Sequence, residues 1–233
     1  MITIVGTGHV FRIQEQVSFI VRNSWPQAVL VELDPQRLAS IRSPIDPEKV
    51  KAPWFYKMMA QQQTRLAEEF GGTVGGDMLA AVEAAERVGA QLVLIDDNAS
   101  IAVKNLLAAM PAREKIRLVL SSLQGRMATK KTVERELTRF SDDEDDYVGE
   151  LREQFPSMMK ALIDDRNERM ADRIRHASGR FQKIIVVVGD AHVEGLVTLL
   201  DGLEVKKIRL KDILDPQRMD TIRRELCQDE VSK

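Results

Sequence analysis

Residues 184–193 read Ile-Ile-Val-Val-Val-Gly-Asp-Ala-His-Val, and the fold class follows from this run. Five consecutive aliphatic residues that end at a glycine predict a short strand buried on both faces. Residues 4–10, Ile-Val-Gly-Thr-Gly-His-Val, repeat the same arrangement near the N-terminus. Each copy is an aliphatic strand followed by Gly-x-x-His-Val and an amphipathic segment. We therefore expect two equivalent strands, each with a histidine at the start of the next helix.

Further compact aliphatic blocks predict the remaining strands of a sheet. The predicted strands are Ile2–Val5, Ala28–Leu33, Leu92–Ile95, Ile184–Val188 and, more weakly, Val205–Leu210. Helical patterns lie between them, at Gln14–Arg22, Met78–Val88 and Ile101–Ala109. This alternation predicts an α/β fold with a central, mostly parallel sheet flanked by helices.

The middle of the chain is long, charged and helical in pattern. We expect helical insertions at about residues 48–70 and 130–178 within a single α/β domain that spans residues 1–233. Pro156 is suited to a first helical position, so the last of these helices should run from Pro156 toward Ser178. The paired glycines at 71–72 and 75–76 predict a turn or flexible loop.

The composition excludes several classes of protein. Among 233 residues, 34 Lys and Arg balance 36 Asp and Glu, for a net charge of -2, which argues against a general nucleic-acid binder. The N-terminus lacks the pattern of a secretory signal, and no segment is long and apolar enough for a membrane span. We expect a cytoplasmic protein. Cys227 alone cannot support a disulfide framework, and we expect it on a helix near the C-terminus.

The two glycine–histidine turns mark a candidate site. Gly6 and Gly189 permit a backbone geometry or a close approach that a side chain would obstruct. In a parallel sheet both turns lie at one edge, which would bring His9 and His192 near the acids that end other strands, Glu32 and Asp96 or Asp97. Such a set suits a divalent metal (Zn, Mn, Fe or Co), and it equally suits acid–base chemistry without a metal. The third histidine, His176, is expected on a helix surface.

An arginine interrupts the apolar face of the helix that starts at Pro156. Arg166 lies between Ile163 and Met170 on that face, and a buried cation requires a partner. Asp165 is its neighbour, but a strand-end carboxylate such as Glu32 is the better geometric candidate. Arg166 would then bind a substrate carboxylate or polarise a substrate oxygen. The alternative is an arginine whose head group reaches solvent at the margin of the stripe.

Four segments together resemble the TraB/PrgY family, which includes the Tiki proteins. They are Gly6-Thr7-Gly8-His9-Val10, Val31-Glu32-Leu33-Asp34 with Arg37-Leu38, Asp165-Arg166-Asn167 with Met170-Ala171, and Val188-Gly189-Asp190-Ala191-His192-Val193 with Gly195. The resemblance covers most of the chain. It implies a fold related to the erythromycin-esterase-like and ChaN-like proteins.

The resemblance also implies a function. Tiki members are divalent-metal-dependent (Mn or Co) peptidases, and PrgY-like members shut down peptide pheromones by degradation or sequestration. The site residues it implies are His9, Glu32, His192, Asp165 and Arg166. Two residues depart from the family pattern: Asp97 stands where an arginine is common, and Asp165 where a glutamate is common. No hydrophobic anchor of the kind many members carry stands at the C-terminal end of this sequence.

Two functions follow as hypotheses. The first is a metal-dependent, peptidase-like hydrolase with His9, His192 and Glu32 as metal ligands (Mn, Co or Zn), Glu32 also serving as a candidate general base, and catalytic roles for Arg166 and Asp165. The second is a non-catalytic module that sequesters a peptide or protein through methionine-bearing helices, although core packing explains methionines more often. The methionines concerned are Met58, Met59, Met158, Met159 and Met170.

Further expectations concern the oligomeric state, nucleotide binding and a serine nucleophile. The long charged helices favour a homodimer. A dinucleotide site is not expected because Gly6-x-Gly8 lacks the third glycine, and neither a phosphate-binding loop nor a Gly-x-Ser-x-Gly nucleophile turn is present.

Overall fold

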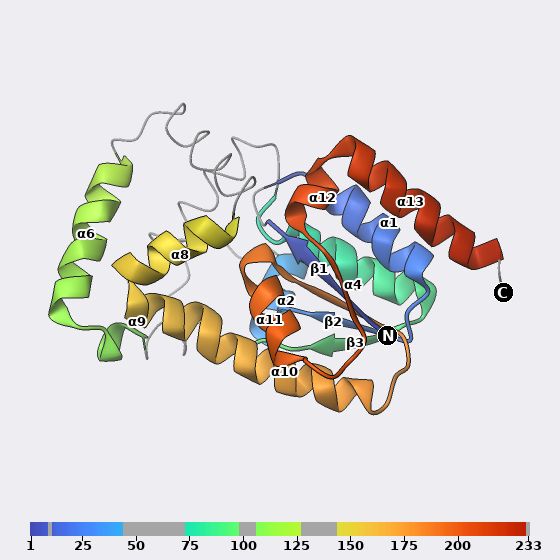
Figure 1. Ribbon diagram of the computed structural model, residues 1–233, viewed down its shortest axis with the longest axis horizontal. Helices are drawn as coiled ribbons and strands as arrows, with labels where there is room; N and C mark the ends of the chain where they lie inside the picture. The colour runs from blue at the N-terminus through green and yellow to red at the C-terminus, as the bar shows by residue number, and fades with distance from the viewer. Residues whose placement is uncertain (9–10, 44–72, 98–105, 127–143, 232–233) are drawn as a thin grey trace.

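A five-stranded, all-parallel sheet forms the centre of the molecule. The structure is a computed structural model that describes residues 1–8, 11–43, 73–97, 106–126 and 144–231. The strands are β1 (Ile2–Thr7), β2 (Ala28–Val31), β3 (Gln91–Leu94), β4 (Ile184–Gly189) and β5 (Val205–Ile208). Their order across the sheet is β3-β2-β4-β1-β5 (Figure 1). The predicted α/β class and all five predicted strands are confirmed.

Strand β4 lies between the two strands that begin the chain. Ile2 of β1 pairs with Ile184, and Ala28 of β2 pairs with the same residue from the other side. The duplicated strands β1 and β4 are therefore direct neighbours, with Gly6 beside Val188 and Thr7 beside Gly189. This register places the ends of both glycine-containing turns at one edge of the sheet.

Helices cover the sheet on both faces. The described helices are α1 (Gln14–Ser24), α2 (Pro35–Arg42), α4 (Gly76–Val88), α6 (Ala112–Arg126), α8 (Glu144–Gln154), α9 (Pro156–Met159), α10 (Asp165–Ser178), α11 (Val193–Leu199), α12 (Leu210–Leu214) and α13 (Pro216–Val231). A π-helical turn, η2 (Lys160–Asp164), joins α9 to α10, and a 3-10 turn, η3 (Asp190–His192), leads into α11.

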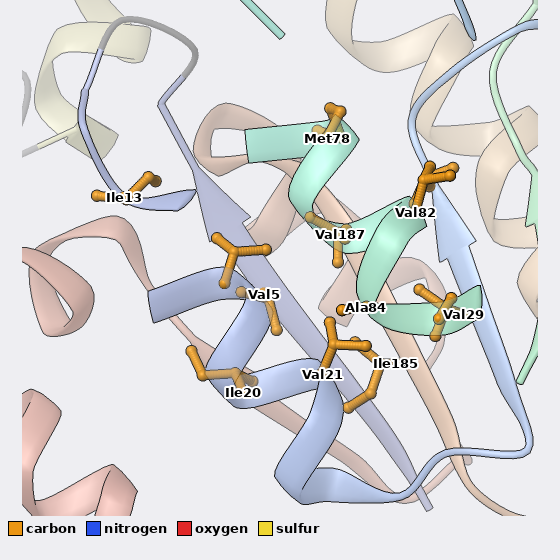
Figure 2. Close-up of a cluster of buried hydrophobic side chains, with 14 of the residues drawn as sticks. Val5, Ile13, Ile20, Val21, Val29, Met78, Val82, Ala84, Ile185 and Val187 are labelled. Carbon is orange, nitrogen blue, oxygen red and sulfur yellow. The ribbon is translucent and has the colours of Figure 1, made fainter. Parts of the chain in front are cut away.

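One core layer lies between the sheet and helices α1 and α4. Alternate strand residues point into it, among them Val5, Val29 and Val187, and they meet Ile20 of α1 and Val82 of α4 (Figure 2). The helix pair meets closely because α4 presents small residues there. These residues are Ala81, Ala84 and Ala85, all fully buried.

The other core layer lies beneath α10 and α11. The intervening strand residues, such as Ile4, Leu30 and Val186, point into it, and α10 contributes Met170 and Ile174. Strand residues alternate between two apolar layers, which is why each strand is a continuous aliphatic run. Figure 1 shows α10 running along the sheet, so this part of the predicted insertion 130–178 belongs to the core.

The helix predicted from Pro156 to Ser178 is present, with the π turn η2 inside it. The predicted helices Gln14–Arg22 and Met78–Val88 correspond to α1 and α4. The predicted insertion at 48–70 and residues 101–105 lie outside the described residues. Gly75 adopts φ 74° and precedes α4, as expected for a turn glycine.

Candidate functional site

The topology has a switch point at the carboxyl end of β4. We call the group of polar residues that meet there, Glu32, Asp96, Arg166 and His192, the crevice, because open α/β sheets form a crevice at such a point. The helices α1 and α4 lie on one face, whereas α10 and α11, which precede and follow β4, lie on the other. Strand β4 therefore stands between two neighbours, β2 and β1, whose connections leave toward the opposite face. Ligands of open α/β sheets bind at such points, outside the carboxyl ends of the strands.

Glu32 follows β2 directly and points into this crevice. Its side chain is 4% exposed and forms an ion pair with the guanidinium of Arg166 through Oε1. Its other oxygen, Oε2, accepts a hydrogen bond from the backbone N–H of Gly189 at 2.7 Å. The expected pairing of Arg166 with the strand-end carboxylate Glu32 is confirmed. The Glu32 carboxylate thus joins the ends of β2 and β4 to the first turn of α10.

Arg166 is held by a second carboxylate, from the end of β3. Its Nε donates to Oδ1 of Asp96 at 3.0 Å and its Nη2 to Oδ2 of Asp96 at 2.8 Å. Burial alone would lower the pKa of Arg166, but the charges of Glu32 and Asp96 and their hydrogen bonds raise it well above its usual value. The guanidinium is therefore a permanent positive charge in the crevice.

The π turn η2 lies immediately before Arg166. Its wider hydrogen bonding has the N–H of Asp165 donating to the carbonyl of Lys160. Within this turn the carbonyl oxygen of Leu162 accepts a hydrogen bond of 3.0 Å from Nη1 of Arg166. Single π turns inside α-helices occur often at functional sites. Here the turn supplies a backbone acceptor for the buried arginine.

His192 completes the cluster from the start of α11. Its Nδ1 lies 2.7 Å from Oδ1 of Asn167, and its Nε2 lies 3.2 Å from Nη1 of Arg166. A guanidinium can only donate, so Nε2 acts as the acceptor and the hydrogen resides on Nδ1, which donates to Asn167. Oε1 of Glu32 lies 3.5 Å from Nε2. The lone pair of Nε2 consequently faces the two charged groups.

A glycine makes room for the amide that orients this ring. A Cβ added at Gly195 would collide with Nδ2 of Asn167 and come within 3.3 Å of its Cγ. Asn167 is buried between α10 and α11 and cannot easily retreat. Gly195 therefore permits the close approach of α11 to α10 that brings Asn167 to His192.

Arg37 adds a second cation to the cluster. Its Nη1 donates to Oδ2 of Asp96 at 3.1 Å and to the carbonyl of Glu32 at 3.3 Å. Arg37 is placed by the start of α2, where Asp34 accepts the N–H of Gln36 at 2.8 Å and the N–H of Arg37 at 3.1 Å. Two arginines thus share Asp96, and the charges of Arg37, Arg166, Glu32 and Asp96 balance.

The structure brings together four of the predicted site residues, Glu32, Asp96, Arg166 and His192. Asp165 is not joined to them by any described contact: its described partner is Lys160, on the exposed side of the helix. His9 lies outside the described residues, so its pairing with His192 stays a prediction. His176 is exposed, as expected, and Cys227 lies on α13 near the C-terminus, also as expected, where it is exposed.

The predicted roles of the two turn glycines are met differently. Gly6 allows a close approach, because a Cβ there would collide with Oδ1 of Asp190. Gly189 has φ -57°, an ordinary value, so its backbone does not require a glycine conformation. Both glycines lie at the paired ends of β1 and β4, where the sequence pattern placed them.

The described part of the crevice does not fit a bound cation with Arg166 in place. Oε1 of Glu32 and Nε2 of His192 both face the guanidinium, which occupies the side of each group that a metal ion would need. Within residues that the structure describes, no group of three His, Cys, Asp or Glu side chains is arranged to hold a metal ion. The predicted ligand set of His9, His192 and Glu32 includes a residue outside that part of the chain.

Two methionines proposed for partner binding belong to the interior. Met170 is 1% exposed in the layer beneath α10, and Met159 is also buried. Met158 is partly buried, and Met58 and Met59 lie outside the described residues. The described methionines therefore act mainly in packing.

Within the described ranges no helix is long and apolar enough to cross a membrane.

The role of Asn167 was missed from the sequence, although it stands next to Arg166. Its signal was its place in the segment Asp165-Arg166-Asn167, which resembles the family, directly after the arginine of the apolar helix face. Asp190 and Arg209, which form a buried ion pair beside the crevice, were also missed. The contact of Asp190 crosses from β4 to the end of β5, and such a pairing depends on the strand order.

Two comparisons relate this chain to known proteins. A model of the TraB/PrgY/gumN family matches residues 1–211. The chain is also 28% identical over 214 residues to the uncharacterized protein MJ1365 of Methanocaldococcus jannaschii, an alignment that covers 87% of this chain and 54% of that protein. The chain thus spans about half the length of this curated relative.

Proposed function

The chain belongs to the TraB/PrgY/gumN family, and on that premise we propose that it is a hydrolase that cleaves a peptide bond at the crevice beside β4. The observation that supports this proposal is the buried contact of His192 with Arg166 and Glu32, with the ring oriented by Asn167. An imidazole of fixed tautomer beside a permanent cation provides a base and an oxyanion stabiliser within one site.

Of the charged groups that contact His192, Arg166 is the more accessible to a substrate. Its side chain is 15% exposed, whereas the side chain of Glu32 is 4% exposed. Its Nη1 donates to the Leu162 carbonyl and to Nε2 of His192. A substrate carbonyl oxygen that replaces His192 as acceptor of Nη1 would be polarised by the guanidinium. The same exchange would release the lone pair of Nε2.

The proposed reaction then needs only groups of this chain and one water. Nε2 of His192 takes a proton as the water oxygen bonds to the carbonyl carbon, and Arg166 stabilises the negative oxygen that forms. When the C–N bond breaks, the proton passes from Nε2 to the leaving amine. Glu32, 3.5 Å from Nε2, stabilises the imidazolium in between. The products are a carboxylic acid and an amine, and transfer of the remaining proton between them gives a carboxylate and an ammonium group.

A metal-dependent form of the same proposal keeps His9, His192 and Glu32 as ligands of Mn, Co or Zn. Such an ion supplies Lewis-acid polarisation of the scissile carbonyl and a more acidic bound water. Because Arg166 stands against both described ligands, this form requires its guanidinium to move away from Glu32 and His192 while it keeps Asp96 as its partner. The position of Arg166 favours the metal-free form.

The test compares two histidine substitutions in cleavage of a quenched fluorescent peptide library. We expect His192→Gln to lower kcat by about 100-fold or more, the usual contribution of a general base. His176→Gln, on the exposed side of α10, is the matched control and should leave kcat unchanged. Full activity of His192→Gln would sink the proposal. Peptide capture without cleavage, unaffected by His192→Gln, would instead establish the sequestering module.

The metal arm of this experiment uses calorimetry with Mn²⁺, Co²⁺ and Zn²⁺ on the same proteins. In the metal-dependent form, Arg166→Gln should bind the ion more tightly because it removes a neighbouring positive charge. The double variant His9→Ala with His192→Ala should lose binding. Unchanged affinity in the double variant would end the metal-dependent form and leave the acid–base form standing.

A further inference from the structure

We propose that Asp190 is a positioning residue, which through Arg209 clamps the turn that carries His192 and so holds the imidazole against Asn167 and Arg166. The inference rests on the proposed role of His192. Its test measures the tautomer of the His192 ring and not peptide cleavage. The positioning role of Asp190 and the catalytic role of His192 can therefore fail separately.

Asp190 uses both carboxylate oxygens on the end of the neighbouring strand. Its Oδ2 accepts from Nε of Arg209 at 3.0 Å, and its Oδ1 accepts the backbone N–H of Leu210, the first residue of α12, at 2.7 Å. The side chain of Asp190 is 4% exposed. The start of η3 is therefore tied to the chain that leaves β5, across the intervening end of β1.

Arg209 extends the clamp to the far side of the histidine. Its Nη1 donates to Oε1 of Glu194 at 2.5 Å, and Glu194 also pairs with Nζ of Lys207 at 2.6 Å. Burial alone would raise the pKa of Glu194, but Lys207 and Arg209 hold it below its ordinary value. Asp190 and Glu194 stand two residues before and two residues after His192. One guanidinium thus fixes both flanks of the turn.

Gly6 is what allows the clamp to close. A Cβ at Gly6 would collide with Oδ1 of Asp190 and would come within 2.8 Å of its Cγ and 2.9 Å of Cγ2 of Val193. The backbone of β1 at Gly6 therefore packs directly against the Asp190 carboxylate. The first glycine–histidine turn gives space to the acid of the second turn, which accounts for a glycine at this point of β1.

A role confined to stability would predict something different. If the ion pair merely fastened β5 and α12 to the sheet, its loss would lower the melting temperature and leave the ring of His192 in place. If it positions the turn, its loss must also release the imidazole. The hydrogen bond from Nδ1 to Asn167 reports that release directly.

The experiment records long-range proton–nitrogen NMR spectra of the three imidazoles in the full chain, over a series of pH values. His9→Gln and His176→Gln variants assign the signals. We expect His192 of the unmodified protein to show a single tautomer with a protected Nδ1–H. In Asp190→Asn, which keeps an acceptor for the Leu210 N–H but loses the charge, we expect that proton signal to disappear and the two tautomers to mix.

Gly6→Ala provides a second route to the same displacement, and it leaves Asp190 ionised. It should give the same loss of the Nδ1–H signal, and combining it with Asp190→Ala should add nothing further because the colliding carboxylate is then gone. Matched controls are Asp220→Asn, which breaks an exposed pair with Arg223, and Gly149→Ala, where a methyl meets nothing within 4 Å. Both should keep the signal.

The proposal is overturned if Asp190→Asn or Gly6→Ala folds with the signal of His192 intact, even when the melting temperature falls. It is equally overturned if the unmodified protein lacks the protonated Nδ1. Loss of the signal in both variants and in neither control supports it, whether or not the protein cleaves a peptide.

Discussion

At the scale of single residues, the site consists of buried polar groups that depend on one another as hydrogen-bond and ion-pair partners. Glu32, Asp96 and His192 are buried, and each makes at least one hydrogen bond with Arg166 or accepts one from the backbone. A buried charge that loses its partner destabilises a protein by about 3–5 kcal/mol. The cluster therefore tolerates substitution poorly, and small residues beside it control how closely its members approach.

Gly195→Ala tests the most local of these constraints. The new methyl would collide with Nδ2 of Asn167, so we expect Asn167 to turn away and His192 to lose the acceptor for Nδ1. Overpacking of this kind costs about 1–3 kcal/mol, which urea unfolding would detect. Activity toward the peptide library should fall with it.

The matched control for this change is Gly149→Ala on α8, where an added methyl meets nothing within 4 Å. There we expect a gain of about 0.5–1 kcal/mol, since alanine favours a helix over glycine. If Gly195→Ala unfolds at the same urea concentration as the unmodified protein, the close approach of Asn167 has been misjudged.

The residues of the site differ in how far the sequence could predict them. Burial of Arg166 on an apolar helix face favoured a carboxylate partner, and Glu32 at a strand end was the better geometric candidate, with an arginine that reaches solvent as the open alternative. The pairing of His192 with Asn167 could not be predicted, because it depends on how closely α11 approaches α10. Asp165 was implied by the family resemblance, but successive helix positions point in different directions, and Asp165 pairs with Lys160 instead.

At the scale of the elements, the strands were predictable and their ends were not. Continuous aliphatic runs identified each strand, yet β2 ends at Val31 rather than at the predicted Leu33. The chain turns there because the N–H of Leu33 donates to the carbonyl of Val31 at 2.7 Å. The π turn η2 left no recognisable pattern in the sequence, since its residues suit an α-helix equally well.

The end of β3 is fastened to α10 by an ion triplet. Asp97 pairs with Nη2 of Arg173 at 2.6 Å and with Nε of Arg169, while Nη1 of Arg173 donates to the carbonyl of Ile95 at 2.6 Å. The two arginines of α10 match the negative charge of Asp97. The triplet fixes the backbone on both sides of Asp96. It therefore also helps to position Asp96, which is a partner of Arg166.

Asp97→Asn should make this contribution visible as a pH dependence. Burial alone would raise the pKa of Asp97, but Arg173 and Arg169 hold it below its ordinary value. A carboxyl whose pKa is lower in the folded state adds stability above its unfolded pKa of about 4, and that stability is lost as the pH falls through the folded value. We expect a difference of about 1 kcal/mol or less between the two proteins at neutral pH, because the carboxylate is partly exposed.

Urea unfolding from neutral pH down to the acid limit of the folded protein would measure this difference. It should shrink below pH about 4. Asp172→Asn is the matched control, since its pair with Arg175 lies on the same helix with the carboxylate 78% exposed, and it should show almost no effect. A constant difference at all pH values would show that the charge of Asp97 is not what stabilises the contact.

At the scale of the whole molecule, the order of the strands could not be predicted from the sequence. The repeated turns indicated that β1 and β4 are equivalent, but five aliphatic strands of similar composition can be arranged in many ways. The observed order inserts β4 between β2 and β1. This insertion brings Glu32 beside Gly189 and Asp190 beside Gly6, so the site arises from the topology rather than from any one segment.

The shared sheet predicts how the molecule unfolds. Each strand sends alternate residues into the layer under α1 and α4 and into the layer under α10, so neither layer can be lost while the other keeps its strands. We therefore expect the sheet and its two helical layers to unfold in one transition. Ile20→Ala in the first layer and Ile174→Ala in the second should each lower the free energy of unfolding by about 2–5 kcal/mol. Each variant should therefore unfold at a lower urea concentration than the unmodified protein.

Circular dichroism at a helix band and the near-ultraviolet signal, followed through the same urea titration, would check this prediction. Both signals should change together in the unmodified protein and in each variant. Ile116→Ala, on the exposed face of α6, is the control and should shift the midpoint little. A variant in which one signal is lost before the other would divide the chain into two independent units. The crevice between them would then lack a fixed geometry, because Arg166 belongs to the layer of α10 while Glu32 belongs to the end of β2.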